Sequence, residues 1–90
     1  MPDTRAIAYS DDKGVSKAEN DICVRLGRVI RRLRQKQGWT QTYLAEHLGF
    51  DRSYLLDLER GKREVCLRNL EVLAIGFGLS PAQLLGKANK

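Results

Sequence analysis

Four glycines, at positions 38, 49, 61 and 78, divide most of the chain into short segments in which apolar residues recur every three or four positions. That spacing places the apolar side chains on one face of an α-helix. A glycine just after the last apolar residue is a common helix stop, because it adopts the left-handed conformation without strain. No alternating apolar and polar pattern of the kind typical of a strand occurs. The chain is therefore predicted to be all-α, with several short helices.

The longest helix is predicted to precede Gly38. Its apolar stripe consists of Ile22, Leu26, Val29, Ile30 and Leu33. Its start is ambiguous, because Ser16 and Glu19 have the spacing of a capping box, whereas Asn20 or Asp21 offers a later N-cap. Residues 1–15 lack this periodicity and contain the polar cluster SDDKG, so we expect a flexible N-terminal arm there.

Four shorter helices are predicted to follow, over about 40–48, 51–60, 67–77 and 80–86. The first two have Thr40 and Asp51 as candidate N-caps. The last has the strongest start, in which Ser80 is the cap, Pro81 is the first helical residue and Gln83 completes a capping box.

The five helices would form one domain over residues 16–86, with a polar tail at 87–90. Residues 1–20 hold three basic and four acidic side chains, and residues 21–90 hold 13 basic and seven acidic ones. The net charge of +5 therefore divides into −1 on residues 1–20 and +6 on residues 21–90, and the positive charge of the helical body indicates an anionic partner. No apolar run approaches the roughly 18 residues that span a bilayer, and no signal-peptide core is present, so we expect a cytoplasmic protein without a membrane partner.

The residue inventory disfavours catalysis and metal binding. The chain has one histidine, His47, and two cysteines, Cys23 and Cys66, whose separation matches no zinc-site spacing. No nucleophile, base and carboxylate pair predicts an active site, so we expect neither enzymatic activity nor a metal, cofactor or small-molecule ligand. The cysteines are interpreted as small, partly buried apolar residues, with a redox-sensing thiol as the alternative.

Two of the short helices, joined by the tight turn LGFD, form the most informative pattern in the chain. The second begins with polar Arg52 and Ser53 and has Leu55 and Leu58 on its apolar side. A helix held in this way can project its first turn into the major groove of DNA and reach base edges.

The segment from Gly38 to Lys62 resembles the Cro and phage-repressor class of helix-turn-helix domains. The matching residues are Gly38, Thr40, Gln41, Leu44, Ala45, Gly49, Leu55, Leu58, Glu59 and Gly61. The following stretch, RGKREVCLRNLEVLA, is similar to the restriction–modification controller proteins of that class. The resemblance covers about residues 22–85 and implies a compact five-helix fold, double-stranded DNA as the partner, and transcription regulation in a bacterial or phage cytoplasm, at the nucleoid.

By position, the resemblance assigns base reading to four residues of the recognition helix: Arg52, Ser53, Leu56 and Asp57. Arg52 suits guanine, through bidentate bonds to O6 and N7. Leu56 suits a thymine methyl group. Asp57 either accepts a hydrogen bond from cytosine N4 or orients Arg52.

Five other residues are assigned to phosphates: Gln41, Tyr54, Arg60, Lys62 and Arg63. For Tyr54, packing at the rim of the core is the alternative. Glu64 departs from the related controllers and weakens the phosphate assignment of this loop. Cys66 stands where a serine cap is expected, and cysteine caps a helix poorly.

Three positions are assigned to architecture. Arg34 and Glu59 fill the family's structural ion-pair positions, and Trp39 occupies a core position. Gly27 interrupts the first helix, at a cost of about 1 kcal/mol relative to alanine. Close packing of another helix against this position is one explanation, which the sequence alone does not decide.

The helix over 67–77 carries two apolar stripes. The first is Leu70, Leu73, Ala74 and Phe77, which a small domain needs for its core. The second is Val72, Ile75 and Leu79, with Leu84 and Leu85 nearby, and it indicates a homodimer interface. The alternative is a core that covers both sides of this helix.

We therefore predict a sequence-specific transcriptional regulator that reads a near-palindromic operator as a homodimer. The alternative is an interaction module of the antitoxin or anti-repressor type, whose main partner is a protein docked by the N-terminal arm.

Overall fold

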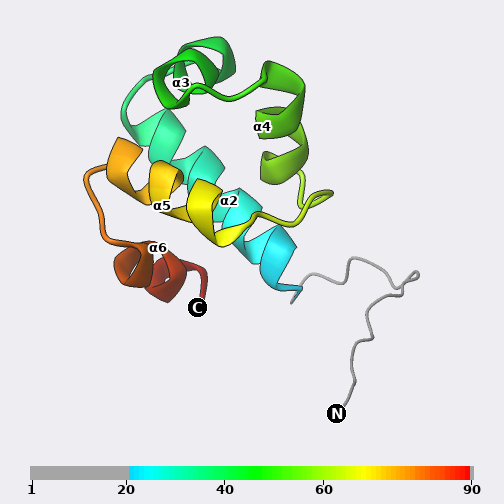
Figure 1. Cartoon of the computed structure of the whole chain (residues 1–90), viewed down its shortest axis with the longest axis vertical. Coiled ribbons are helices and arrows are strands. Elements are labelled where there is room, and N and C mark those ends of the chain that lie inside the picture. The colour runs from blue at the N-terminus through cyan, green and yellow to red at the C-terminus, as the bar shows by residue number, and fades with distance from the viewer. Residues whose placement is uncertain (1–20, 90) are drawn as a thin grey trace.

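The computed structural model describes residues 21–89, which form five α-helices joined by short connections (Figure 1). The helices are α2 (Ile22–Lys36), α3 (Gln41–Leu48), α4 (Arg52–Glu59), α5 (Leu67–Gly76) and α6 (Pro81–Ala88). This part of the chain contains no strand, and the predicted all-α, five-helix architecture is confirmed. The predicted arm 1–15, the capping box of Ser16 and Glu19, and Asn20 lie outside the described residues.

Most helix ends follow the signals in the sequence. The carboxylate of Asp21 accepts a hydrogen bond from the Cys23 N–H at 2.8 Å, and Thr40 accepts one from the Tyr43 N–H at 3.0 Å. Ser80 forms the expected capping box with Gln83, in which each side chain bonds the other residue's N–H. The glycines at 38, 49, 61 and 78 all have φ between 74° and 76°, the left-handed conformation that ends a helix.

The helix α2 connects the two ends of the bundle. It packs against α4 and α6, while α3 packs against α4 and α5, and α5 packs against α6. Figure 1 shows α3 and α4 at one end of the molecule and α6 at the other. The buried apolar core consists of Leu26, Val29, Ile30, Leu44, Ala45, Leu55, Leu58, Leu70, Leu73, Ala74, Leu84 and Ala88. Trp39 is half-buried against this core and stacks on Phe77, with ring centroids 5.9 Å apart.

Close packing explains Gly27. A Cβ at this position would lie 2.4 Å from the Leu58 carbonyl oxygen and 2.6 Å from that of Glu59. Both are backbone atoms, which cannot rotate away as a side chain could. Gly27 is therefore the point at which α2 approaches the end of α4.

The structure corrects two predictions about the C-terminal helix. Leu84 was expected at a dimer interface, but it is completely buried in the chain's own core, with 0% of its surface exposed. The helix α6 also continues to Ala88, past the predicted boundary at 86, because Ala88 packs into the same core with 2% exposure. Residues 87 and 88 thus belong to the helix and not to a polar tail.

The two cysteines differ in environment. Both are free thiols, and Cys23 is half-buried, as the sequence predicted. Cys66 is exposed instead, because it occupies the N-cap of α5, where its side chain forms no capping hydrogen bond. No helix within residues 21–89 is both long and apolar enough to cross a membrane.

Candidate nucleic-acid interface

The helices α3 and α4 form the helix-turn-helix unit, and the turn between them determines how α4 is presented. Gly49 has φ +76°, and the Phe50 N–H donates to the Ala45 carbonyl at 2.8 Å, which closes the end of α3. The helix α4 then buries Leu55 and Leu58 in the core. Its anchored side faces the protein, so its first turn is left in solvent.

The four residues predicted to read bases lie along α4. Arg52 and Ser53 in the first turn are exposed, whereas Leu56 and Asp57, one turn later, are half-buried. Among the described residues, no ion pair joins Arg52 to Asp57. Asp57 therefore does not orient Arg52 through an ion pair in the unbound chain, and both side chains are available to a ligand.

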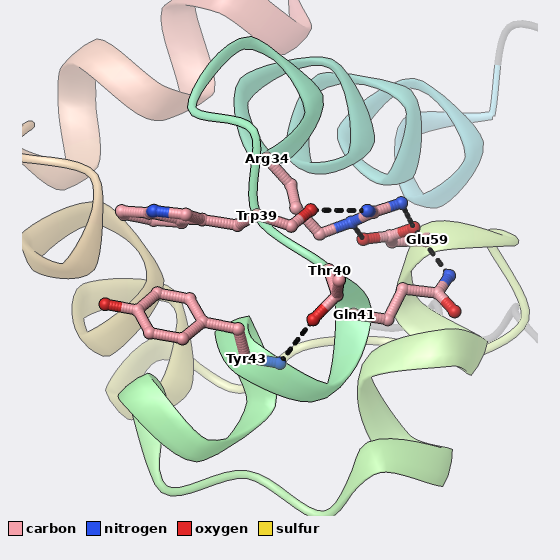
Figure 2. A network of polar contacts seen from close by, with 6 residues as sticks. All are labelled: Arg34, Trp39, Thr40, Gln41, Tyr43 and Glu59. Atoms are coloured by element: carbon pink, nitrogen blue, oxygen red, sulfur yellow. Dashed lines mark hydrogen bonds and ion pairs between the residues drawn. The ribbon is translucent and has the colours of Figure 1, made fainter.

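A buried polar network fixes the end of α4 relative to α2 (Figure 2). The expected pair is present: Arg34 Nε donates to Glu59 Oε2 at 2.7 Å, and Arg34 Nη2 donates to Glu59 Oε1 at 3.1 Å. The third guanidinium nitrogen, Nη1, donates to the Trp39 carbonyl at 2.9 Å. Bidentate geometry and a third acceptor satisfy an arginine side chain that is only 10% exposed.

This network also reaches a predicted phosphate contact. Gln41 Nε2 donates to Glu59 Oε1 at 3.1 Å (Figure 2), which leaves its second amide N–H for another acceptor. Gln41 is the first residue of α3, directly after the Thr40 cap. The ion pair therefore holds the Gln41 side chain at the N-terminus of a helix, where the dipole favours an anion.

The remaining predicted phosphate contacts follow α4. Arg60, Lys62 and Arg63 are all exposed on the segment between α4 and α5. Tyr54 is half-buried against the core, so the alternative of rim packing describes its ring. Its hydroxyl has a different role, because it accepts a hydrogen bond from Asn69 Nδ2 at 3.0 Å.

Sequence reasoning missed two residues at the start of α5. Arg68 and Asn69 line an open hollow of about 600 Å³ together with residues of α4 and its flanking loops, among them Ser53, Tyr54, Asp57 and Arg63. Their only signal in the sequence was their polarity beside the core positions of α5. Nothing in the spacing of Tyr54 and Asn69 relates the two positions, because the rest of α4 and the segment between α4 and α5 separate them.

The predicted dimer stripe is divided between core and surface. Ile75 is 67% exposed and Leu85 is 39% exposed, whereas Val72 and Leu79 are half-buried. Leu67 lies outside that stripe and is the most exposed large apolar residue of the described chain, at 82%. Residues 21–89 contain no group of three or more histidine, cysteine or acidic side chains that could hold a metal ion.

Comparison with known proteins agrees with this geometry. The helix-turn-helix family model matches residues 30–84. The control protein C.MunI of a Mycoplasma species is 36% identical over 72 residues, which cover 79% of this chain and 97% of that protein.

Two solved structures extend the likeness to the fold. The restriction–modification controller C.AhdI of Aeromonas hydrophila is 40% identical with a TM-score of 0.65, over 69% of this chain and 94% of the other. The controller C.Esp1396I, solved as a tetramer with its natural 35 base-pair operator, is 27% identical with a TM-score of 0.65, over 77% and 96% of the two chains. The chain thus belongs to the helix-turn-helix family of DNA-binding transcriptional regulators, among the relatives of the restriction–modification controllers.

Proposed function

We propose that the first turn of α4 enters the major groove of duplex DNA and reads the base sequence of an operator. The observation that carries this proposal is the exposure of Arg52 and Ser53 on a helix whose other side is fixed by buried Leu55 and Leu58. A rigid element that presents polar side chains at its N-terminus meets the geometric need of base readout.

Each base-reading residue has a role that suits its chemistry. Arg52 donates two hydrogen bonds to guanine, and Ser53 bonds either a base edge or the adjacent backbone. Leu56 packs on a thymine methyl group, and Asp57 accepts from cytosine N4. The half-buried positions of Leu56 and Asp57 favour contacts nearer to the body of the domain than those of Arg52.

The operator is bound mainly through its phosphates. Gln41 offers its free amide N–H at the start of α3, and Tyr54 offers its hydroxyl. Arg60, Lys62 and Arg63 supply positive charge from one exposed segment. These contacts set the register of α4 on the duplex, whereas the base contacts select the sequence.

The base-reading claim is tested by selecting bound sequences from random duplex DNA and then measuring the affinity of variants. We expect Arg52→Ala to weaken binding to the selected operator by about 5- to 150-fold and to relax the preference at one base pair. Lys87→Ala is the matched control, because it removes the same charge from exposed α6, at the other end of the molecule (Figure 1). Unchanged affinity and unchanged base preference of the Arg52 variant at every position would contradict base reading by this residue.

We further propose that the protein binds as a homodimer. Ile75, Leu85 and Leu67 are exposed apolar side chains on two helices that pack together, and Val72 and Leu79 add partly exposed area. Such a surface is costly to leave in water and is self-complementary in a two-fold dimer. Two α4 helices then reach half-sites about one helical turn apart, so the operator is near-palindromic.

The dimer is tested by sedimentation equilibrium on Ile75→Asp. A buried unpaired carboxylate at the two-fold interface should shift the protein to monomer and weaken operator binding. Gln35→Asp introduces the same group on an exposed position of α2 and should leave the mass unchanged. A wild-type protein that stays monomeric at the concentration that saturates the operator would overturn this part of the proposal.

The proposed activity is binding alone, without catalysis, a cofactor or a small-molecule ligand. A regulator of this kind acts where the DNA is, so we place it in the cytoplasm at the nucleoid. Its control of transcription follows from operator occupancy, and thus from protein concentration and dimerisation.

A further inference from the structure

Tyr54 is the meeting point of three elements. Its ring packs edge-on against Phe50 of the turn, with centroids 5.2 Å apart. The guanidinium carbon of Arg63, from the segment after α4, lies 5.0 Å from the centroid of the ring. Its hydroxyl accepts the hydrogen bond from Asn69 of α5.

The Asn69 contact determines what the hydroxyl can do next. A phenol has one proton to donate and accepts through its oxygen lone pairs. Since the Asn69 amide is the donor in this bond, the phenol proton is not used there and remains for an acceptor elsewhere. A backbone phosphate offers acceptor oxygens only, so it fits the remaining proton.

The Arg63 contact orders a second phosphate ligand. A guanidinium over a tyrosine ring is held by cation–π attraction, which restricts an otherwise mobile side chain of an exposed segment. A contact that holds the Tyr54 ring in place therefore also restricts the position of the Arg63 guanidinium above it.

The surroundings are consistent with an anion at this place. Arg63 and Arg68 line the same hollow as Tyr54 and Asn69. Asp51 and Asp57 also line it and would repel a phosphate, so the charged lining consists of two cations and two anions. The two arginines and the Tyr54 phenol are the groups in this lining that would bind an anion.

We propose that Asn69 is a positioning residue for operator binding, which acts through the Tyr54 hydroxyl and does not itself touch DNA. It directs the phenol proton to a phosphate and keeps the ring beneath Arg63, so that α5 contributes to the DNA-binding face from behind it. This inference rests on the proposed function, in that Tyr54 and Arg63 contact phosphates.

A double-mutant cycle with Asn69→Ala and Tyr54→Phe tests the inference on the full chain and a duplex that carries the selected operator. We expect Tyr54→Phe to weaken binding about 10- to 150-fold, the loss typical of one hydrogen bond to a charged group, and Asn69→Ala to weaken it by no more than that, because it misaligns the same bond. The double variant should bind no more weakly than Tyr54→Phe alone, because the two changes interrupt one path. An equal loss from Asn69→Ala in both backgrounds, or no loss at all, would overturn the inference.

The salt dependence of binding separates positioning from direct contact. Tyr54 and Asn69 are neutral, so neither variant should change the slope of log affinity against log salt. Arg63→Ala should reduce that slope by about one per protomer. A changed slope for Asn69→Ala would mean that its effect comes from the charged Arg63 contact and would contradict the path through the hydroxyl.

Asn69→Asp is the second variant, in case alanine disturbs folding. Aspartate has the same shape but accepts the phenol proton instead of donating to its oxygen. We expect it to weaken binding more in the wild-type background than in the Tyr54→Phe background, and equal effects would refute the inference. If Arg52→Ala loses operator binding and every Asn69 variant keeps it, this inference alone is refuted. If no operator is selected by the wild-type chain, the proposed function is refuted.

Discussion

At the scale of single residues, two buried polar side chains, Arg34 and Glu59, connect α2 to the end of α4. Arg34 and Glu59 come from helices far apart in the sequence, and every guanidinium nitrogen of Arg34 has an acceptor. Replacing such a pair by apolar residues is often tolerated, whereas removing one partner leaves an uncompensated charge. The pair thus fixes the orientation of α4 and of Gln41 at the same time.

We expect Glu59→Gln to destabilise the domain by about 3–5 kcal/mol, because the Arg34 charge would be left buried without its counterion. Urea denaturation followed by circular dichroism measures the change. The double variant Arg34→Met/Glu59→Leu should be more stable than Glu59→Gln, since it removes both charges. A double variant less stable than the single one would mean that the ion pair itself is strongly favourable.

A second residue-scale test concerns Gly27. Alanine there should cost about 1–3 kcal/mol, because the added Cβ would overlap the backbone at the end of α4. Gly86→Ala is the matched control, since nothing lies within 4 Å of a Cβ at that helical position. We expect it to stabilise the domain by about 0.5–1 kcal/mol. Stabilisation by both substitutions in thermal unfolding would refute the close approach of α2 and α4.

At the scale of helices, the caps differ in quality. The helix α6 has a complete capping box at Ser80, whereas Cys66 begins α5 with N-cap backbone geometry, φ −74° and ψ 160°, and no side-chain bond. Cys66→Ser should therefore stabilise the domain by about 0.5–1 kcal/mol, and Ser80→Ala should destabilise it by about 1 kcal/mol. The two melting temperatures, measured against the wild type, check both signs. No gain from Cys66→Ser would mean that its hydroxyl cannot reach the N–H groups of the first turn.

How much of these helices could be predicted from the sequence depends on whether the contacts involved are local or join distant parts of the chain. Thr40, Asp21 and the glycines act within a few residues of a helix end, so the sequence contained their partners. The burial of Leu84 depends on how α6 packs against α2 and α5, which no local pattern encodes. The hydrogen bond from Asn69 to Tyr54 crosses a gap of 15 positions between two helices, so the polarity of Asn69 was visible in the sequence but its partner was not.

At the scale of the whole molecule, the charge of each protomer and the oligomeric state together determine how steeply DNA binding depends on salt concentration. Arg60, Lys62 and Arg63 supply three cations from each protomer. Counterion release then gives a slope of log affinity against log salt of about −2.7 for one bound protomer and about −5.4 for two. Between 50 and 200 mM salt, the affinity should fall about 40-fold for a bound monomer and about 2,000-fold for a bound dimer.

Removal of one cation distinguishes the two cases more sharply than the absolute slope does. Lys62→Ala removes one of the proposed phosphate contacts per protomer, so it should reduce the slope by about 2 for a dimer and by about 1 for a monomer. Lys87→Ala lowers the net charge equally at an exposed position of α6 and should leave the slope unchanged. Fluorescence anisotropy with the selected operator over that salt range measures all three proteins. A reduction of about 1 would contradict the homodimer, and an unchanged slope would contradict the phosphate contact of Lys62.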